Sequence, residues 1–145
     1  MTAKQTINQT SNQTSKKTRV TAEAVLHITV GETLAESGLR AVRAMKALHR
    51  GEPVRPYFGV SFTEMTQMLS AFTPRRWELV AVLREGGPMT VAELARRLGR
   101  HYKNVHTDVA HLIEWLAVER TEDDRVHVPW SEIIVDMKLP QRQAA

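Results

Sequence analysis

The helix start and stop signals within residues 73–116 constrain the fold more than any other feature, because capping residues and glycines divide this stretch into three short helices. A first helix is expected over 74–85, since a Thr-Pro pair precedes it and Gly-Gly-Pro follows it. A second helix is expected over 91–98, with Thr90 as its N-cap and Gly99 as its stop. The short, glycine-containing turn after the second helix is typical of a helix-turn-helix.

A third helix is expected over 102–116. Its apolar residues recur at spacings of four, three and four, which predicts one buried face made of Val105, Val109, Leu112 and Leu116. Two short β-prone runs, VERTE and RVHVPW, then flank the acidic pair Asp123-Asp124 and predict a β-hairpin. Three helices followed by a hairpin predict a winged helix-turn-helix over 73–138.

The residues upstream alternate between strand and helix patterns. The expected elements are a strand over 24–30, a helix over 32–50, a strand over 58–62 and a short helix over 63–72. The alternating run IIVDM predicts a last strand, which we expect to return and pair with the N-terminal strands.

The predicted fold class is therefore α+β, in which a small strand-helix-strand element over 21–72 precedes the winged helix-turn-helix. The helix over 32–50 is the candidate surface for dimerisation. Residues 1–20 are expected to form a disordered basic arm, because they are almost all Thr, Gln, Asn, Ser and Lys. Residues 139–145 are expected to be a tail.

Charge distribution limits where a polyanion would bind. The chain has 20 Lys and Arg against 16 Asp and Glu, for a net charge of +4. The four basic residues of the arm, Lys4, Lys16, Lys17 and Arg19, account for this whole excess. Attraction to a nucleic acid must therefore come from the arm and from one local patch.

That patch is expected on the exposed face of the third helix and around the turn before it. Lys suits guanine acceptors, Asn suits adenine, and hydroxyl and imidazole groups suit bases or phosphates. Basic residues of the second helix and of the hairpin flanks are candidate phosphate contacts. Together the candidate DNA-binding residues are Arg96, Arg97, Arg100, His101, Tyr102, Lys103, Asn104, His106, Thr107, His111, Arg120 and Arg125. We expect Asp108 to form an ion pair with a nearby arginine, and the three tryptophans to lie in the core or an interface.

Metal, cofactor and catalytic sites are not predicted. The histidines at 101, 106 and 111 follow steps of five residues, each a rotation of about 140° on a helix, so they diverge. The chain has 0 cysteines. It also lacks the Walker loop, the G-x-S-x-G elbow and the His-Glu-x-x-His helix. We therefore expect a binding protein and not an enzyme.

The run from Phe72 to Met137 resembles the predicted MarR-like winged-helix regulators of bacteria and archaea, which are often assigned as antitoxins of toxin-antitoxin pairs. With the upstream strand-helix-strand, the resemblance extends over roughly 25–138. The segments LARRLGRHYKNVHTDVAHL and RVHVPWSEI carry most of the resemblance. It implies sequence-specific binding of double-stranded DNA, a homodimer, and repression of the protein's own operon. Two positions depart from the pattern, because Leu116 and Asp124 stand where such proteins usually have glycine.

Two alternatives remain open at this stage. The winged helix could instead dock a partner protein, with neutralisation of a toxin as the strongest form of that function. Alternatively, the basic arm could drive binding to RNA or to nucleic acid of any sequence, with a strong dependence on salt. A cytoplasmic location is expected, because the chain lacks both cysteine and the apolar core of a signal peptide.

Overall fold

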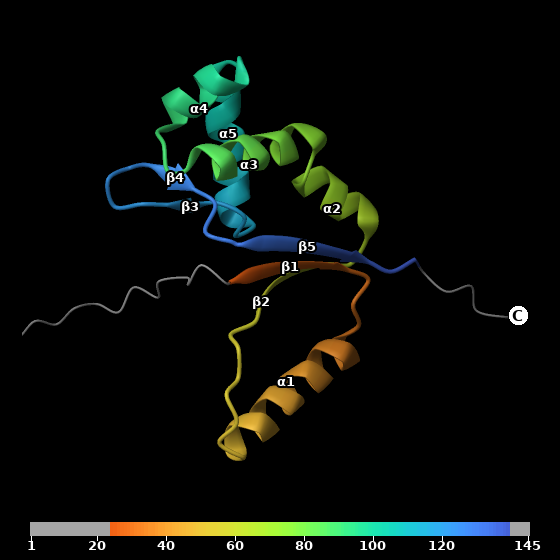
Figure 1. Ribbon diagram of the computed structural model, residues 1–145. Helices are drawn as coiled ribbons and strands as arrows, with labels where there is room; N and C mark the ends of the chain where they lie inside the picture. The colour runs from red at the N-terminus through yellow and green to blue at the C-terminus, as the bar shows by residue number, and fades with distance from the viewer. Residues whose placement is uncertain (1–23, 140–145) are drawn as a thin grey trace, which may run out of the picture.

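The structure is a computed structural model that describes residues 24–139. The predicted arm over 1–20, and the predicted tail apart from Leu139, lie outside the described residues. In the described part of the chain, a strand-helix-strand unit is followed by four helices and then by three strands (Figure 1). In order they are β1 (Val25–Val30), α1 (Leu34–His49), β2 (Phe58–Phe62), α2 (Met65–Ala71), α3 (Pro74–Gly86), α4 (Val91–Leu98), α5 (Tyr102–Glu114), β3 (Glu119–Arg120), β4 (Val126–His127) and β5 (Glu132–Met137). The fold class is α+β, as the sequence predicts.

A small parallel sheet has the strand order β2-β1-β5. Both neighbours run parallel to β1, so that Ile28 lies between Val60 and Val135. The prediction that the last strand returns to the N-terminal strands is confirmed by the pairing of β5 with β1. The parallel pair β1 and β2 is joined by α1 as its crossover helix.

The two sides of the sheet are covered differently. Figure 1 shows α2, α3, α4 and α5 on one side of the sheet and α1 on the other. Alternation along β1 turns Leu26, Ile28 and Val30 toward the first side, where all three are buried. From β2, the Phe62 ring meets Trp115 at 4.8 Å between centroids and Phe72 at 6.2 Å. The core therefore lies between the sheet and the helices that follow it in the sequence.

The core continues through the helices and the hairpin. Leu79 and Leu83 of α3, Leu94 of α4 and Val105 of α5 are all fully buried. The hairpin β3–β4 is antiparallel, and Met89, just before α4, exchanges two backbone hydrogen bonds with Val126. The hairpin is thereby attached to the start of α4 as well as to the end of α5.

One position in the predicted core is wrong. Leu116 is 47% exposed, because α5 ends at Glu114 and Leu116 has a left-handed φ of 65°. This turn sends Ala117 and Val118 into the core, and the Trp130 indole nitrogen donates a hydrogen bond to the Leu116 carbonyl at 2.6 Å. Asp124 likewise has a φ of 60°. The backbone thus takes the glycine-like conformation at both positions without glycine.

Candidate nucleic-acid interface

The turn between α4 and α5 is fixed by local backbone chemistry. The Thr90 hydroxyl accepts a hydrogen bond from the Glu93 N–H at 3.2 Å and caps the start of α4. Gly99 ends that helix with a φ of 62°, which a side chain would disfavour. His101 then caps α5, since its Nδ1 accepts from the Lys103 N–H at 3.3 Å. These three residues set the angle at which α5 leaves α4.

The two faces of α5 differ sharply in exposure. Its apolar residues Val105, Val109 and Leu112 have no exposed surface, as the spacing predicts. The predicted polar residues lie on the opposite side, and every one of them is exposed: Tyr102, Lys103, Asn104, His106, Thr107 and His111. The structure therefore brings six of the twelve candidate residues together on one exposed helix face.

Of the two carboxylates of α5, Asp108 is held away from this face, whereas Glu114 is exposed at the helix end, 3.7 Å from His111. Asp108 accepts hydrogen bonds from Arg76 of α3 at 3.0 Å and from Arg100 at 2.6 Å. All three side chains are only 13–15% exposed. Burial favours the neutral carboxyl, but the hydrogen bonds and charges of Arg100 and Arg76 outweigh it and hold the pKa of Asp108 below its ordinary value. The ion pair expected for Asp108 is confirmed, with two arginines instead of one.

This network changes the position of Arg100 relative to the sequence expectation. The sequence predicts that Arg100 reaches DNA, whereas its guanidinium lies inward against Asp108. Arg76, which the sequence analysis did not select, also donates to the Ala71 carbonyl at 2.8 Å. It thereby joins α2, α3 and α5. Its signal in the sequence is weak, since Arg76 and Asp108 are 32 residues apart.

The remaining candidate arginines lie beside acidic residues. Arg96 and Arg97 both form ion pairs with Glu93 on the surface of α4. In the hairpin, Arg120 pairs with Asp124 at 2.6 Å and Arg125 with Asp123 at 3.3 Å. Arg120 and Arg125 each have a carboxylate of their own, whereas Arg96 and Arg97 share Glu93 and keep one excess positive charge. His101 is exposed and stands at the start of the α5 face.

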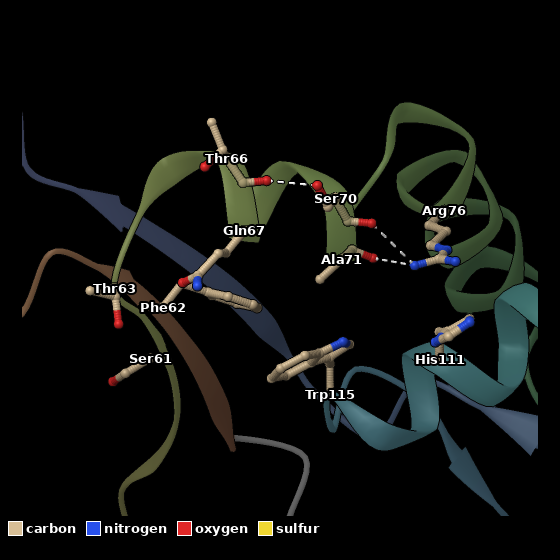
Figure 2. A pocket seen from close by; sticks show the side chains of 10 residues that line it. All are labelled: Ser61, Phe62, Thr63, Thr66, Gln67, Ser70, Ala71, Arg76, His111 and Trp115. Carbon is tan, nitrogen blue, oxygen red and sulfur yellow. Dashed lines mark hydrogen bonds between the residues drawn. The ribbon is translucent and has the colours of Figure 1, made fainter.

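A pocket of about 630 Å³ lies beside the C-terminal half of α5. Figure 2 shows α2 along one side of it and Trp115 with His111 along the other. Phe62 contributes part of the apolar lining of the pocket. Hydroxyl and amide side chains contribute most of its polar lining, and these belong to Ser61, Thr63, Thr66, Gln67 and Ser70. Sequence reasoning did not find this pocket, because its walls come from segments about 40 residues apart.

Comparisons with known proteins bear on the same segment. A family model described as HVO_A0114 matches residues 71–135, from the last residue of α2 into β5. No curated protein and no solved structure matches the chain. The matched segment contains the whole of α3, α4, α5 and the hairpin. It leaves β1, α1 and β2 outside.

Within residues 24–139, none of the helices has the length and apolar character needed to cross a membrane. The same residues contain no group of three or more His, Asp or Glu side chains placed to hold a metal ion.

Proposed function

We propose that this protein is a cytoplasmic, sequence-specific DNA-binding regulator of the winged helix-turn-helix type, similar to the MarR-like regulators. In this proposal α5 is the recognition helix and enters the major groove of double-stranded DNA. Regulation takes the form of repression, including repression of the protein's own operon.

The exposed face of α5 is the observation that supports this proposal most directly. Lys103 supplies a cation that suits guanine O6 and N7, and Asn104 supplies an amide that suits the adenine edge. Thr107 and His106 lie one turn further along the same exposed face. Because Asp108 is turned back and paired with Arg76 and Arg100, residues 102–107 offer donors to DNA without a competing carboxylate. The exposed Glu114 lies at the end of α5, beside His111.

The other arginines take different roles in this proposal. Arg76 and Arg100 act as positioning residues, because they hold α5 through Asp108 from behind the DNA-facing surface. Arg96 and Arg97 are exposed on α4 and are assigned to DNA phosphates. This role requires them to break their ion pairs with Glu93 when DNA binds. Arg120 and Arg125 contribute less, since the hairpin tip around them is acidic.

The experiment is a selection of bound sequences from a random DNA library by purified full-length protein. We expect an enriched motif for the wild type. The double variant Lys103→Ala/Asn104→Ala is expected to bind that motif at least about tenfold more weakly, because a good base contact contributes about 1–3 kcal/mol of discrimination. Arg55→Ala is the matched control, since it removes one exposed charge from the loop between α1 and β2.

Two results would contradict the proposal. If the double variant Lys103→Ala/Asn104→Ala bound the enriched motif as tightly as Arg55→Ala and the wild type, the DNA contact would lie outside α5. A flat selection profile would favour the second candidate function, a module that binds a partner protein. The acidic hairpin favours that candidate, because Glu119, Glu122, Asp123 and Asp124 would repel phosphates and attract a basic partner surface.

A further inference from the structure

The helix α1 has an apolar face that the rest of the described chain does not cover. None of its 16 residues is buried. Leu34 is 91% exposed, Met45 68% and Leu48 63%. Single exposed leucines are common in folded domains, but several large apolar side chains exposed side by side on one helix are rare.

The side of α1 that faces the remainder of the chain is polar. Arg40 forms an ion pair with Glu32, and its guanidinium carbon lies 4.2 Å from the centre of the Tyr57 ring. Lys138, which follows β5, donates to the Glu36 carboxylate at 2.9 Å. The helix is thus attached through its polar side, and its apolar side is turned outward.

Five exposed residues of α1 follow the repeat of a helix-helix seam, while the exposed Leu39 and Val42 lie outside it. Leu34, Gly38, Ala41, Met45 and Leu48 are separated by four, three, four and three residues. This spacing keeps the five residues in one stripe along the helix, which we call the α1 stripe. All five are exposed, and none carries a charge.

The α1 stripe is complementary to itself when a second copy runs in the opposite direction. Leu34 and Leu48 are each seven residues from Ala41, so an antiparallel pair centred on Ala41 brings Leu34 of one copy to Leu48 of the other. Gly38 and Met45 lie three and four residues from the same centre. Met45 of one copy therefore lies opposite Ser37 of the other and beside Gly38, where the missing side chain leaves room for it as a knob in a hole.

Gly38 is an independent indication of a close approach from outside. Glycine disfavours the interior of a helix, so its presence there needs a reason. A Cβ atom added at Gly38 would meet no described atom within 4 Å, so packing within the described chain does not require glycine. A second helix lying against this position would require it.

We propose that a second copy of this chain covers the α1 stripe, in an antiparallel pair of α1 helices whose two-fold axis passes beside Ala41. This arrangement goes beyond DNA reading by α5 and does not depend on it. A lipid surface fits less well, because membrane-surface helices present bulky Trp, Phe and Leu side chains, whereas α1 has no aromatic residue and the centre of its stripe is Gly38 and Ala41.

The size of the helix pair sets the expected strength of the dimer. A helix of 16 residues is about 24 Å long, and a single pair of such helices covers less than the roughly 800 Å² per partner of a standard stable interface. We therefore expect a dimer that dissociates on dilution.

Disulfide trapping tests the geometry, since the chain has 0 cysteines and any introduced cysteine reports alone. Ala41→Cys is expected to cross-link to itself under mild oxidation. Leu34→Cys and Leu48→Cys are expected to cross-link when mixed, and much less when each is oxidised alone. Arg43→Cys, on the opposite face of α1, is the control and is expected to remain monomeric.

A second variant tests the same surface without cross-linking. Met45→Glu places a charge in the α1 stripe and is expected to abolish the concentration-dependent dimer in sedimentation equilibrium while leaving the melting temperature of the monomer unchanged. Arg43→Glu is expected to leave dimerisation unchanged.

Three results would overturn the proposal. The first is a monomeric wild type at every concentration, with Ala41→Cys cross-linking no faster than Arg43→Cys. The second is self-cross-linking of Leu34→Cys without cross-linking in the mixture, which would indicate a parallel pair. The third is binding to phosphatidylserine-containing vesicles that Met45→Glu abolishes, which would assign the stripe to a lipid surface.

Discussion

The helices α1 and α5 have similar amphipathic patterns but place their apolar faces in opposite ways. In α5 the apolar residues recur at intervals of three and four, and Val105, Val109 and Leu112 are fully buried. In α1 the same kind of spacing leaves Leu34 and Leu48 in solvent. Periodicity therefore defines a face in both helices but does not determine what covers it.

The difference follows from what lies beneath each helix. Under α5 are the apolar residues of α3, α4 and β2, so burying its apolar face removes much hydrophobic surface from water. Under α1 lie the Glu32 carboxylate and the face of the Tyr57 ring, and Arg40 interacts with both. Each helix thus turns toward the chain the face that matches its neighbours, and this leaves a polar surface on α5 and an apolar one on α1.

The largest expected effect compares matched truncations in the two helices. Leu112→Ala removes a fully buried side chain from α5 and should lower the free energy of unfolding by about 2–5 kcal/mol. Leu48→Ala in α1 should change that free energy by no more than about 0.5 kcal/mol in the dilute monomer, because the side chain is already exposed. Urea denaturation of both variants measures the difference. Equal losses would mean that α1 is covered within a single chain, and the contrast between the helices would then be wrong.

An intermediate effect is expected at the ion pairs behind α5. Asp108→Asn leaves Arg76 and Arg100 without their carboxylate in a mostly buried site, which should cost about 2–4 kcal/mol of stability at neutral pH. Asp123→Asn on the exposed hairpin is the control, with an expected change within about 0.5 kcal/mol.

The pH dependence of this loss provides a further check. Because the pKa of folded Asp108 is lowered, its carboxylate contributes stability above the unfolded-state pKa of about 3.9. That contribution is lost as the pH falls through the lower folded-state pKa. The stability gap between wild type and Asp108→Asn should therefore narrow in acid. A gap that stays constant down to acid unfolding would show that packing, and not charge, is what Asp108 supplies.

Much of the fold could be predicted from local sequence signals. Thr90 and Gly99 bound α4 as expected, because caps act within a single turn. The alternation in IIVDM predicts β5, and a lone edge strand would need a partner, which is why its return to β1 could be expected. Likewise, the polar face of α5 follows directly from the positions of its buried valines.

The remaining features depend on contacts that no local pattern contains. Arg100 is basic and follows the turn after α4, so the sequence places it with the expected DNA contacts, while its inward position depends on Asp108 eight residues later. Arg76 enters the same network from another helix. The pocket beside Trp115 requires β2, α2 and α5 to meet. Such arrangements are properties of the packed chain.

The smallest expected effect concerns Leu116, which follows the end of α5. Leu116 continues the spacing of Val105, Val109 and Leu112 but turns outward with a φ of 65°. A left-handed conformation costs a residue with a side chain about 1–2 kcal/mol, and replacing Leu116 with glycine removes this cost. Part of the resulting gain in stability is lost, because glycine makes the unfolded chain more flexible. Leu116→Gly should therefore raise the free energy of unfolding by about 0.5–1 kcal/mol.

Leu116→Ala is the informative control, because it removes the half-exposed side chain and keeps the cost of the left-handed backbone. It should be no more stable than the wild type, and thermal unfolding of the three proteins should place Gly above both. If Ala and Gly were equally stable, the backbone at Leu116 would be under no strain. The hydrogen bond from Trp130 to its carbonyl would then be enough to explain the turn that ends the α5 face.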